Sequence, residues 1–367
     1  MRALTIHGKD DLRQEEIPTP APGPGQVRIR MAYAGICGSD LHYWVDGANG
    51  AFVVREPLVP GHEVSGTVDL DPSGTLATGT PVTVHPATFG ICEPGLEDKP
   101  HLWPQGAYLG SASTWPHTQG GMSEFLVVER GMVRVLPPGL PLRRACLAEP
   151  LAVALHAIAL AGGVEGRSVL VSGSGPIGLL TAAAARAGGA TRVLASDALA
   201  GPLARARALG VHETLRAGVD PLPENSVDVV LECSGAAAAL NAAVVAVRRA
   251  GVVVQVGMMA AGPHPVALAP LVAKEVALLG SFRFHDEIDD AVRLLAADPS
   301  IEQVITHEFA AQDAVEAFAT ARDSDGSGKV VIALWPDEPS PAPGAPDPTP
   351  TAPRPTPIRP APLEDPA

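Results

Sequence analysis

The chain has 367 residues, 46% of them apolar, which is enough for one large core or two moderate ones and favours two domains. Its net charge of −14 at pH 7, with no run of Lys or Arg, argues against nucleic acid as a partner. The N-terminal stretch "MRALTIHGKDDLRQ" has no apolar signal segment, and the long apolar stretches elsewhere contain charged residues. We therefore predict a soluble, cytoplasmic protein that does not enter a membrane.

Two sequence patterns follow one another along the chain. Residues 1 to about 140 contain short β-prone runs, among them "QVRIRMAY", "EVSGTVDL", "TPVTVH" and "SEFLVVE", separated by Gly and Pro clusters, which predicts a β-rich domain. From about residue 145, an Ala-rich helix precedes apolar strands that alternate with helices, as in "RSVLVSG", "TRVLASD", "VDVVLECSG" and "GVVVQVGM". Such alternation predicts a parallel, doubly wound sheet, so we expect an α/β protein with domains at residues 1–144 and 145–280.

Three side chains in the first domain and one at the start of the second are candidate metal ligands. Cys37 lies in "GICGSDLHYW", His62 and Glu63 are adjacent in "PLVPGHEVSG", and Glu149 begins the helix in "LAEPLAVALHA". Thiolate, imidazole and carboxylate are all ligands of zinc, and the four cysteines lack the regular spacing of a disulfide framework. Each residue alone also fits an ordinary role, as a buried thiol, a satisfied polar group or a charge at a helix start. Their combination with a nucleotide-binding pattern favours a metal site.

That pattern lies in "VLVSGSGPIGLLTAAAARAGGATRVLASD", where Gly173, Gly175 and Gly178 form Gly-x-Gly-x-x-Gly. The glycines alone are a weak signal, but an apolar strand precedes them, a helix follows with Pro176 in its first turn, and Asp197 ends the next strand. This context lets the backbone approach a pyrophosphate at a helix N-terminus, while Asp197 accepts hydrogen bonds from the adenosine ribose. We therefore predict dinucleotide binding rather than a structural turn.

Asp197 also indicates which dinucleotide binds. A carboxylate at the ribose would repel a 2′-phosphate, and the next residues, Ala198 and Leu199, supply no guanidinium to compensate. We therefore expect NAD to be preferred over NADP. Arg205 and Arg207 lie further along the chain and could weaken this preference.

Residues 336–367 differ from the rest of the chain. Proline dominates them, together with Ala, Thr and Asp, and large apolar side chains are almost absent. Such a composition cannot offset the entropy of ordering, so we predict a disordered spacer rather than a docking ligand.

Several stretches, in the same order, resemble the zinc-dependent medium-chain dehydrogenases, and within them the branch of sorbitol and L-idonate 5-dehydrogenases. The resemblance covers residues 1 to about 335 and rests on "GICGSDLHYW", "VREPLVPGHEVSG", "LGSASTWPHTQGG", "AEPLAVALHA", "GSGPIG" and "LVAKEVALLGSFRF". It implies a GroES-like catalytic domain, completed by residues 281–335, and a Rossmann NAD-binding domain. It also implies one catalytic Zn²⁺ held by Cys37, His62 and Glu63, with Glu149 at the metal directly or through a water molecule.

The resemblance further implies a proton relay and the residues that meet the ligands. Ser39 would take the proton of the substrate alcohol and His42 would carry it to solvent, with Glu149 as a further catalytic group. A turn hydroxyl and a surface imidazole are the alternatives for Ser39 and His42. The residues expected to bind the cofactor are Gly173, Gly175, Pro176, Ile177, Gly178, Asp197, Val256 and Gly257. The residues expected at the substrate are Tyr43, Arg283, Phe284 and His117. For His117, an ordinary loop position is an equal alternative.

The chain departs from the family where many members hold a second, structural zinc with four cysteines. The corresponding stretch, "FGICEPGLEDKPHLW", keeps only Cys92, and one thiol cannot close a tetrahedral site. We therefore predict a single zinc ion per chain and expect Phe89, Trp103 and the prolines to stabilise this lobe instead. Cys146 and Cys233 are interpreted as buried thiols, with Cys233 near the cofactor.

A sugar acid or a polyol is the substrate that the resemblance implies. "SFRF" places Arg283 where this branch has an arginine that reaches the substrate cleft, and a guanidinium can pair with a carboxylate through two hydrogen bonds. Sorbitol dehydrogenases carry that arginine too, but "LGSASTWPHTQGG" and Phe284 favour the idonate enzymes. We expect oxidation of L-idonate at C5 to 5-keto-D-gluconate by a homo-oligomer, either a dimer or a tetramer. The alternatives are a sorbitol- or xylitol-type polyol dehydrogenase, a zinc-free reductase of the same fold, and a non-catalytic NAD-binding regulatory protein.

Overall fold

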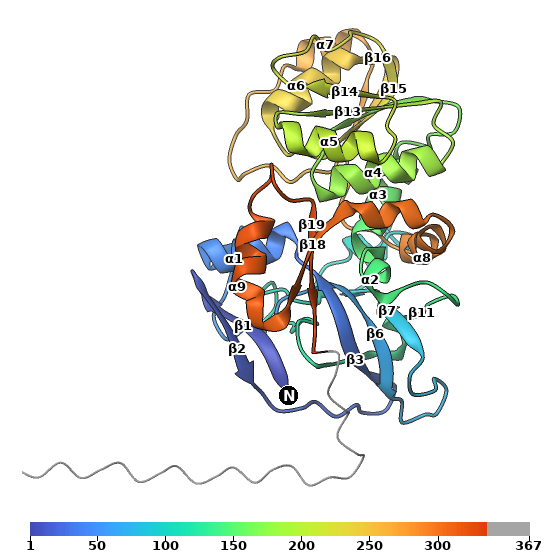
Figure 1. Ribbon diagram of the computed structural model, residues 1–367. Helices are drawn as coiled ribbons and strands as arrows, with labels where there is room; N and C mark the ends of the chain where they lie inside the picture. Colours follow the sequence, from blue (N-terminus) through green and yellow to red (C-terminus); the bar gives the residue numbers. More distant parts are fainter. Residues whose placement is uncertain (336–367) are drawn as a thin grey trace, which may run out of the picture. The chain divides into compact units, whose positions relative to one another are not determined.

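The computed structural model describes residues 1–335, which contain two large β-sheets (Figure 1). The predicted disordered spacer, residues 336–367, lies outside the described residues. Within residues 1–335, no helix is both long enough and apolar enough to cross a bilayer.

The first large sheet combines strands from the beginning of the chain with two strands from the end of its described part. Its order is β11-β7-β6-β3-β19-β18, and β10 also pairs with β3. The strands are β3 (Gln26–Gly35), β6 (Glu63–Leu70), β7 (Pro81–Val84), β10 (Phe125–Glu129), β11 (Val133–Val135), β18 (Ile305–Ala310) and β19 (Lys329–Ala333). β19 runs antiparallel to β3 and parallel to β18. Strands from the end of the described chain thus share one sheet with its first strands.

Strand β3 shows why these segments form a sheet with one buried face. Val27, Ile29 and Met31 are buried, while Arg28 and Arg30 alternate with them and are partly exposed. This alternation with a period of two is typical of an antiparallel strand that packs one face on a core.

Short hairpins and helices surround the first sheet. The hairpins are β1 (Arg2–Gly8) with β2 (Asp11–Glu16), β4 (Ala48–Asn49) with β5 (Phe52–Val53), and β8 (Ala87–Thr88) with β9 (Ala107–Tyr108). The helices are α1 (Gly38–Asp46), α2 (Leu142–Ala145) and α9 (Ala314–Ala321), and the 3-10 turns are η1 (Pro100–Leu102), η2 (Arg130–Met132) and η4 (Ala311–Asp313). The lobe that lacks the four cysteines lies between β8 and β9.

Within residues 1–335, the second large sheet has six strands, all parallel, in the order β14-β13-β12-β15-β16-β17. Its strands are β12 (Ser168–Ser172), β13 (Arg192–Asp197), β14 (Glu213–Arg216), β15 (Val227–Glu232), β16 (Val247–Gln255) and β17 (Ala277–Gly280). The helices that alternate with them are α4 (Pro176–Ala187), α5 (Ala200–Ala208), α6 (Ala237–Ala246) and α7 (Leu268–Ala273). The strand order reverses between β12 and β15, and ligands of doubly wound sheets bind beyond the carboxyl ends of strands at such a point.

Helices α3 (Ala148–Leu160) and α8 (Glu287–Ala297) lie between the two sheets, and η3 (Pro299–Val304) follows α8 (Figure 1). α3 packs against both α4 and α8. Its residues are mainly Ala and Leu and most are buried, as expected of a helix that is apolar on every side. The first turn of α3 therefore carries Glu149 into the region between the sheets.

Candidate active site

Cys37, His62 and Glu63 lie together at the ends of two paired strands. β3 ends at Gly35, which pairs with Glu63 at the start of β6. Cys37 follows β3, and one ligand atom from each of the three side chains lies within 4.8 Å of the others. Among residues 1–335, this is the one group of three or more potential ligands at that spacing. Antiparallel pairing therefore assembles a site from residues that are distant in the sequence.

Cys37, His62 and Glu63 are called the metal cluster below. A glycine and a buried aspartate shape the backbone around them. A Cβ on Gly35 would lie 2.1 Å from Oε2 of Glu63, so the glycine gives that carboxylate room. The fully buried Asp40 accepts hydrogen bonds from the backbone N–H groups of Cys37 at 2.9 Å and Gly61 at 3.2 Å, and burial raises the pKa of Asp40. Asp40 thus joins the loop of the cysteine to the loop of the histidine, a role that the sequence pattern does not reveal.

A buried lysine from the end of the described chain also contacts the metal cluster. Lys329, the first residue of β19, donates hydrogen bonds to Oε1 and Oε2 of Glu63 at 2.6 and 2.7 Å and to the carbonyl of Ile36 at 3.0 Å. Burial alone would lower the pKa of Lys329, but the Glu63 carboxylate raises it. Lys329 is missing from the predicted site because no local pattern links it to a residue 266 positions earlier.

The donors and the charge of the metal cluster fit a zinc ion. A thiol, an imidazole and a carboxylate in one cluster are ligands that Zn²⁺ takes. Nδ1 of His62 is buried and has no hydrogen-bond partner among residues 1–335. Burial alone would lower the pKa of His62, but the neighbouring Cys37 and Glu149 raise it to about 10. The surroundings therefore stabilise a positive charge at this point, which a metal cation would supply.

Glu149 is buried beside the metal cluster and is held by a tyrosine. Its Oε1 accepts a 2.5 Å hydrogen bond from the hydroxyl of Tyr108, whose ring packs against that of His62 with centroids 5.4 Å apart. Burial raises the pKa of Glu149. Glu149 lies outside the group of mutually close ligand atoms, so a direct bond to the metal stays a prediction. Tyr108 is a site residue that the sequence analysis missed, because a single tyrosine in a two-residue strand carries no signal.

The two residues of the predicted proton relay lie on α1. Ser39 is partly buried in the first turn. The side chain of His42 is 62% exposed, and its Nδ1 lies 3.2 Å from Oδ2 of Asp46. A surface imidazole and the outer end of a relay both require such contact with solvent, so the relay stays a prediction.

Arg283 lies close to the buried carboxylate of the site. Its guanidinium carbon is 4.0 Å from the centre of the Tyr108 ring, and the Tyr108 hydroxyl binds Glu149. Burial lowers the pKa of Arg283, with Tyr108 and Glu149 acting in the opposite direction. Nearby, Tyr43 is almost fully buried, and its hydroxyl accepts a hydrogen bond from the N–H of Ala112 at 3.0 Å. These contacts hold a cation beside the metal cluster.

The structure places two of the predicted substrate residues in buried positions. Phe284 is 1% exposed and packs in the core against His85, with ring centroids 4.8 Å apart, so its contact with the substrate stays a prediction. His117 is also buried. Its Nε2 accepts a hydrogen bond from the N–H of Arg55 at 2.9 Å, and its Nδ1 donates one to the carbonyl of Thr114 at 3.0 Å. Both ring nitrogens are used within the protein, which favours the alternative of a loop residue.

The predicted glycine loop connects β12 to α4, which begins at Pro176. Gly173 has a φ of 88°, and a Cβ on Gly178 would lie 1.8 Å from the carbonyl oxygen of Gly173. A Cβ on Gly175 would meet nothing within 4 Å. Gly173 and Gly178 therefore serve the packing of the loop itself, whereas Gly175 leaves open space at a helix N-terminus, which suits a pyrophosphate.

A cavity of about 240 Å³ joins the metal cluster to the glycine loop. Its lining includes Cys37, Glu63 and Lys329 on one side and Gly175, Ile177 and Cys233 on the other. A ligand bound at the glycine loop can therefore reach the metal cluster.

A second cavity, of about 470 Å³, lies at the carboxyl ends of β13 and β14 and is called the adenosine cavity below. Asp197 lines it. The carboxylate of Asp197 accepts hydrogen bonds from the backbone N–H groups of Ser174 at 2.7 Å and Leu199 at 2.9 Å. Arg216, which the sequence analysis missed, lines the same cavity.

Val256 and Gly257, also predicted to bind the cofactor, follow β16 and are partly buried. A Cβ on Gly257 would lie 2.2 Å from the backbone nitrogen of Gly235, so this glycine allows two loops to pack closely. Neither residue lines the two cavities, and their contact with the cofactor stays a prediction.

The lobe between β8 and β9 is held by aromatic and polar contacts. Cys92 is a free, exposed thiol, and it belongs to no group of three or more close potential metal ligands among the described residues. The indole N–H of Trp103 donates a 2.7 Å hydrogen bond to the carbonyl of Leu96. Phe89 packs edge-on against His85, with centroids 5.4 Å apart. One zinc ion per chain stays a prediction.

Known proteins share both halves of this arrangement. Residues 23–138 match the alcohol dehydrogenase GroES-like domain, and residues 176–297 match the zinc-binding dehydrogenase family model. Sorbitol dehydrogenase from Macaca fascicularis is 34% identical over 355 residues, which cover 92% of this chain and 97% of that protein. The chain belongs to the zinc-dependent medium-chain dehydrogenases, in their sorbitol dehydrogenase-like branch.

Solved structures agree with this family. The dehydrogenase is similar to L-idonate 5-dehydrogenase from Escherichia coli, with a TM-score of 0.84 and 31% identity over 90% of this chain and 97% of that one. It is also similar to an Escherichia coli alcohol dehydrogenase complexed with NADH, with a TM-score of 0.81 and 26% identity over 91% and 99% of the two chains. The predicted family and its fold, a GroES-like part with a Rossmann sheet, are confirmed.

Proposed function

We propose that this dehydrogenase oxidises L-idonate at C5 to 5-keto-D-gluconate, with NAD as the preferred acceptor. The observation that carries the proposal is the position of Arg283. Its guanidinium packs 4.0 Å from the ring centre of Tyr108, and the hydroxyl of that tyrosine binds Glu149 beside the metal cluster. A cation at this point suits a substrate whose carboxylate lies a few carbons from the reacting alcohol.

The metal cluster would hold zinc through Cys37, His62 and Glu63. Bound there, zinc supplies a Lewis acid that lowers the pKa of an alcohol. Lys329 orients the carboxylate of Glu63 and balances part of the negative charge of the cluster. Asp40 holds the backbone of the two ligand loops in place.

We assign removal of the alcohol proton to α1. Ser39, two residues after Cys37, would accept the proton from the substrate hydroxyl. His42 would pass it to solvent, since its side chain is largely exposed. The carboxylate of Asp46 orients the ring of His42 through Nδ1.

The preference for NAD rests on Asp197. NAD supplies the hydride acceptor, and its adenosine ribose would lie in the adenosine cavity. Two backbone N–H groups fix the carboxylate of Asp197 there, where it can accept hydrogen bonds from ribose hydroxyls and repel a 2′-phosphate.

A neutral polyol, such as sorbitol or xylitol, is the second candidate substrate. The negative charge of Glu149 already lies near Arg283 and offsets part of its positive charge. The hydrogen-bond donors of the guanidinium could then serve neutral hydroxyl groups, and the likeness to sorbitol dehydrogenase supports this alternative.

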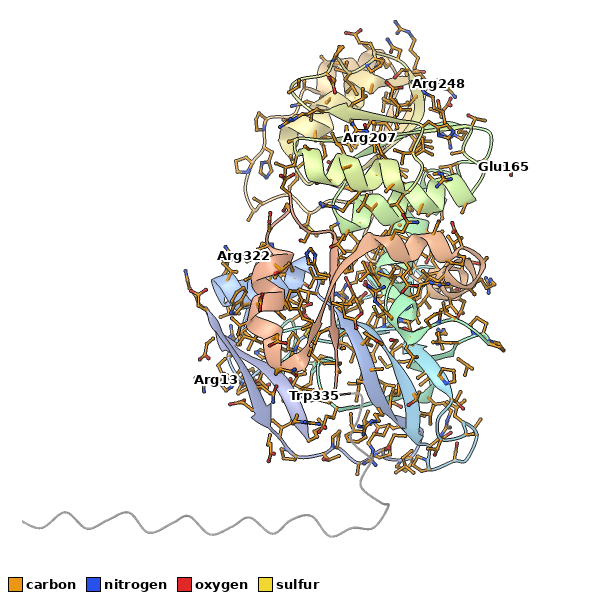
Figure 2. The ribbon with its side chains drawn as sticks, in the orientation of Figure 1. Arg13, Glu165, Arg207, Arg248, Arg322 and Trp335 are labelled. Carbon is orange, nitrogen blue, oxygen red and sulfur yellow. The ribbon has the colours of Figure 1, made fainter. Side chains whose placement is uncertain are left out.

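Catalytic efficiency on L-idonate, sorbitol, xylitol and L-threonine tests the substrate. We expect the highest kcat/KM with L-idonate, and a clear preference for a neutral polyol or for the amino acid would contradict the proposal. Arg283→Ala should raise KM for L-idonate much more than for sorbitol, because only the acid loses a charged partner. Arg248→Ala removes an exposed arginine of the second sheet (Figure 2). This variant is the matched control and should change KM for neither L-idonate nor sorbitol.

We also propose a homo-oligomer, either a dimer or a tetramer. β17 is an edge strand of the second sheet, and all four of its residues are exposed, including Leu278 and Leu279. An exposed, apolar strand edge is a template for pairing with another chain. Analytical ultracentrifugation should find a dimer or tetramer, and a monomer at micromolar concentration would contradict the assignment.

The cytoplasmic location is a proposal that rests on the thiols. All four cysteines are free, which suits a reducing compartment.

A further inference from the structure

Arg216 lies in the wall of the adenosine cavity. It is the last residue of β14, and the parallel pairing of β13 with β14 sets it directly beside Asp197. Both side chains line the adenosine cavity. Much of the remaining wall is small, with Ala198, Ala217 and Gly218 next to the two charged residues. The cavity therefore has room for an adenosine between a fixed anion and a cation.

The guanidinium of Arg216 is anchored at one side only. Its Nε donates a hydrogen bond to the carbonyl of Ala198 at 3.3 Å. Within residues 1–335, its two terminal nitrogens have no hydrogen-bond or ion-pair partner, and the side chain is exposed. The group is thus held beside the cavity with both terminal nitrogens left for a ligand.

The arginines that the sequence pattern suggested for this role are placed differently. Arg205 donates hydrogen bonds from its terminal nitrogens to the carbonyls of Ser324 and Asp325, at 3.0 and 2.9 Å. Arg207 lies on α5 and is not among the residues that line the adenosine cavity (Figure 2). Neither Arg205 nor Arg207 lines the adenosine cavity, whereas Arg216 does, so an effect of the first two arginines on the NAD preference stays a prediction.

Asp197 and Arg216 act in opposite directions on a 2′-phosphate. The carboxylate repels it, and the guanidinium attracts it and can donate two parallel hydrogen bonds. Asp220 also lines the cavity and adds repulsion, although its Oδ2 already accepts the backbone N–H of Arg216 at 2.7 Å. This balance predicts weak NADP binding that is limited by Asp197.

We propose that Arg216 forms a binding site for the 2′-phosphate of NADP. Repulsion by the carboxylate of Asp197 limits binding at this site. The inference rests on the proposed dinucleotide function and names the residue that sets tolerance of NADP. Loss of the Asp197 carboxylate alone should then shift the preference from NAD toward NADP, because the guanidinium of Arg216 is already in place.

Calorimetric titration of the full chain with 5′-AMP and 2′,5′-ADP tests this inference without substrate or turnover. The wild type should bind 5′-AMP more tightly than 2′,5′-ADP, and Asp197→Ser should raise affinity for 2′,5′-ADP roughly tenfold or more, the size expected of one charged interaction. Arg216→Gln should lower the affinity for 2′,5′-ADP roughly tenfold, both alone and in combination with Asp197→Ser, because a charge-assisted contact is lost. Binding of 5′-AMP should persist in each variant, which also shows that the variant is folded.

Two further variants separate a specific contact from a general effect of charge. Arg216→Lys keeps the charge but loses the planar pair of donors, so it should retain part of the affinity for 2′,5′-ADP. Arg207→Gln removes an exposed arginine from the neighbouring helix and should not change the affinity for either nucleotide.

The outcomes distinguish this inference from the function on which it rests. An unchanged affinity of Arg216→Gln for 2′,5′-ADP, an equal loss of both nucleotides, or the same loss in Arg207→Gln would overturn the role of Arg216 and leave dinucleotide binding intact. Failure of the wild type to bind either nucleotide would refute dinucleotide binding and this inference with it.

Discussion

The metal end and the adenosine end of the cofactor site are held in different ways. At the metal end, buried side chains from other segments hold the ligands, with Asp40 on the ligand loops and Lys329 on Glu63. At the adenosine end, backbone N–H groups of neighbouring loops hold Asp197. Removal of a buried supporting side chain at the metal end should therefore lower stability, whereas removal of the Asp197 carboxylate should change nucleotide affinity and leave the fold intact.

Loss of a metal ligand should have the largest effect. Cys37→Ser should lose its zinc and reduce kcat at least about a hundredfold, because the metal supplies several kcal/mol of transition-state stabilisation. Binding of NAD should persist, since the glycine loop belongs to the other sheet. Elemental analysis and titration with NAD measure the two effects. Two zinc ions in the wild type, or loss of NAD binding in the variant, would contradict this prediction.

Removal of the buried partner of Glu63 should destabilise the whole protein. Both side chains of the pair are at most 3% exposed, so Lys329→Met leaves a buried carboxylate without a counter-ion. The free energy of unfolding should fall by about 3–5 kcal/mol, measured by urea unfolding with a chelator present. Adding Glu63→Gln to this variant should recover part of the loss.

An exposed ion pair provides the control for this experiment. Arg13 pairs with Asp11 at 2.6 Å, and their side chains are 52% and 38% exposed (Figure 2). Arg13→Ala should have no measurable effect on unfolding, because solvent screens such a pair. If Lys329→Met were equally harmless, the buried pair would not support the metal end.

Two glycines of the same loop separate packing from ligand contact. Gly178→Ala should weaken NAD binding and lower the free energy of unfolding by about 1–3 kcal/mol, because the added Cβ overlaps the carbonyl of Gly173. Gly175→Ala should weaken NAD binding while unfolding stays nearly unchanged, since its Cβ enters open space. Urea unfolding and NAD titration measure both variants. Equal stability of the two variants would show that the loop is not held by its own packing.

Substitution of Glu287, the first residue of α8, should have a smaller effect on stability. Its carboxylate accepts hydrogen bonds from Nδ1 of His156 at 2.7 Å and from the N–H of His285 at 2.8 Å. Burial alone would raise the pKa of Glu287, but these bonds lower it to about 2. A lowered pKa stabilises the fold above the ordinary value of 4.5, and this stabilisation is lost as the pH falls toward 2.

Comparison of the wild type with Glu287→Gln across pH checks this sign. At pH 7 the wild type should be more stable by about 1 kcal/mol, a figure reduced from the full shift because the side chain is partly exposed. The difference should shrink as the pH falls below 4.5. A difference that stays constant down to pH 3 would mean that the charge of Glu287 is not what stabilises the fold.

Local patterns predict the adenosine end well. The strand, the glycines, the helix start and Asp197 follow one another within one stretch, and the structure places them at the ends of adjacent strands. The metal ligands are separated in the chain, and the family resemblance was needed to identify them as one set of ligands. The structure brings Cys37, His62 and Glu63 together.

Contacts between distant segments and the directions of side chains could not be predicted. Lys329 and Tyr108 reach the site through strand pairing and loop packing that no spacing in the sequence reveals. Phe284 and His117 were chosen for their residue types within motifs, but a motif does not show whether a side chain faces the core or a cleft. Arg216 was missed because its neighbour Asp197 belongs to a different strand.

The place of β19 between β3 and β18 sets an order on the synthesis of this enzyme. Residues 329–333 leave the ribosome after every strand of the second sheet, which is contiguous from β12 to β17. Until then the first sheet has an unfilled position, and Glu63 has no lysine beside it. A message that stopped just before residue 329 would encode a complete nucleotide-binding sheet together with an unfinished metal site.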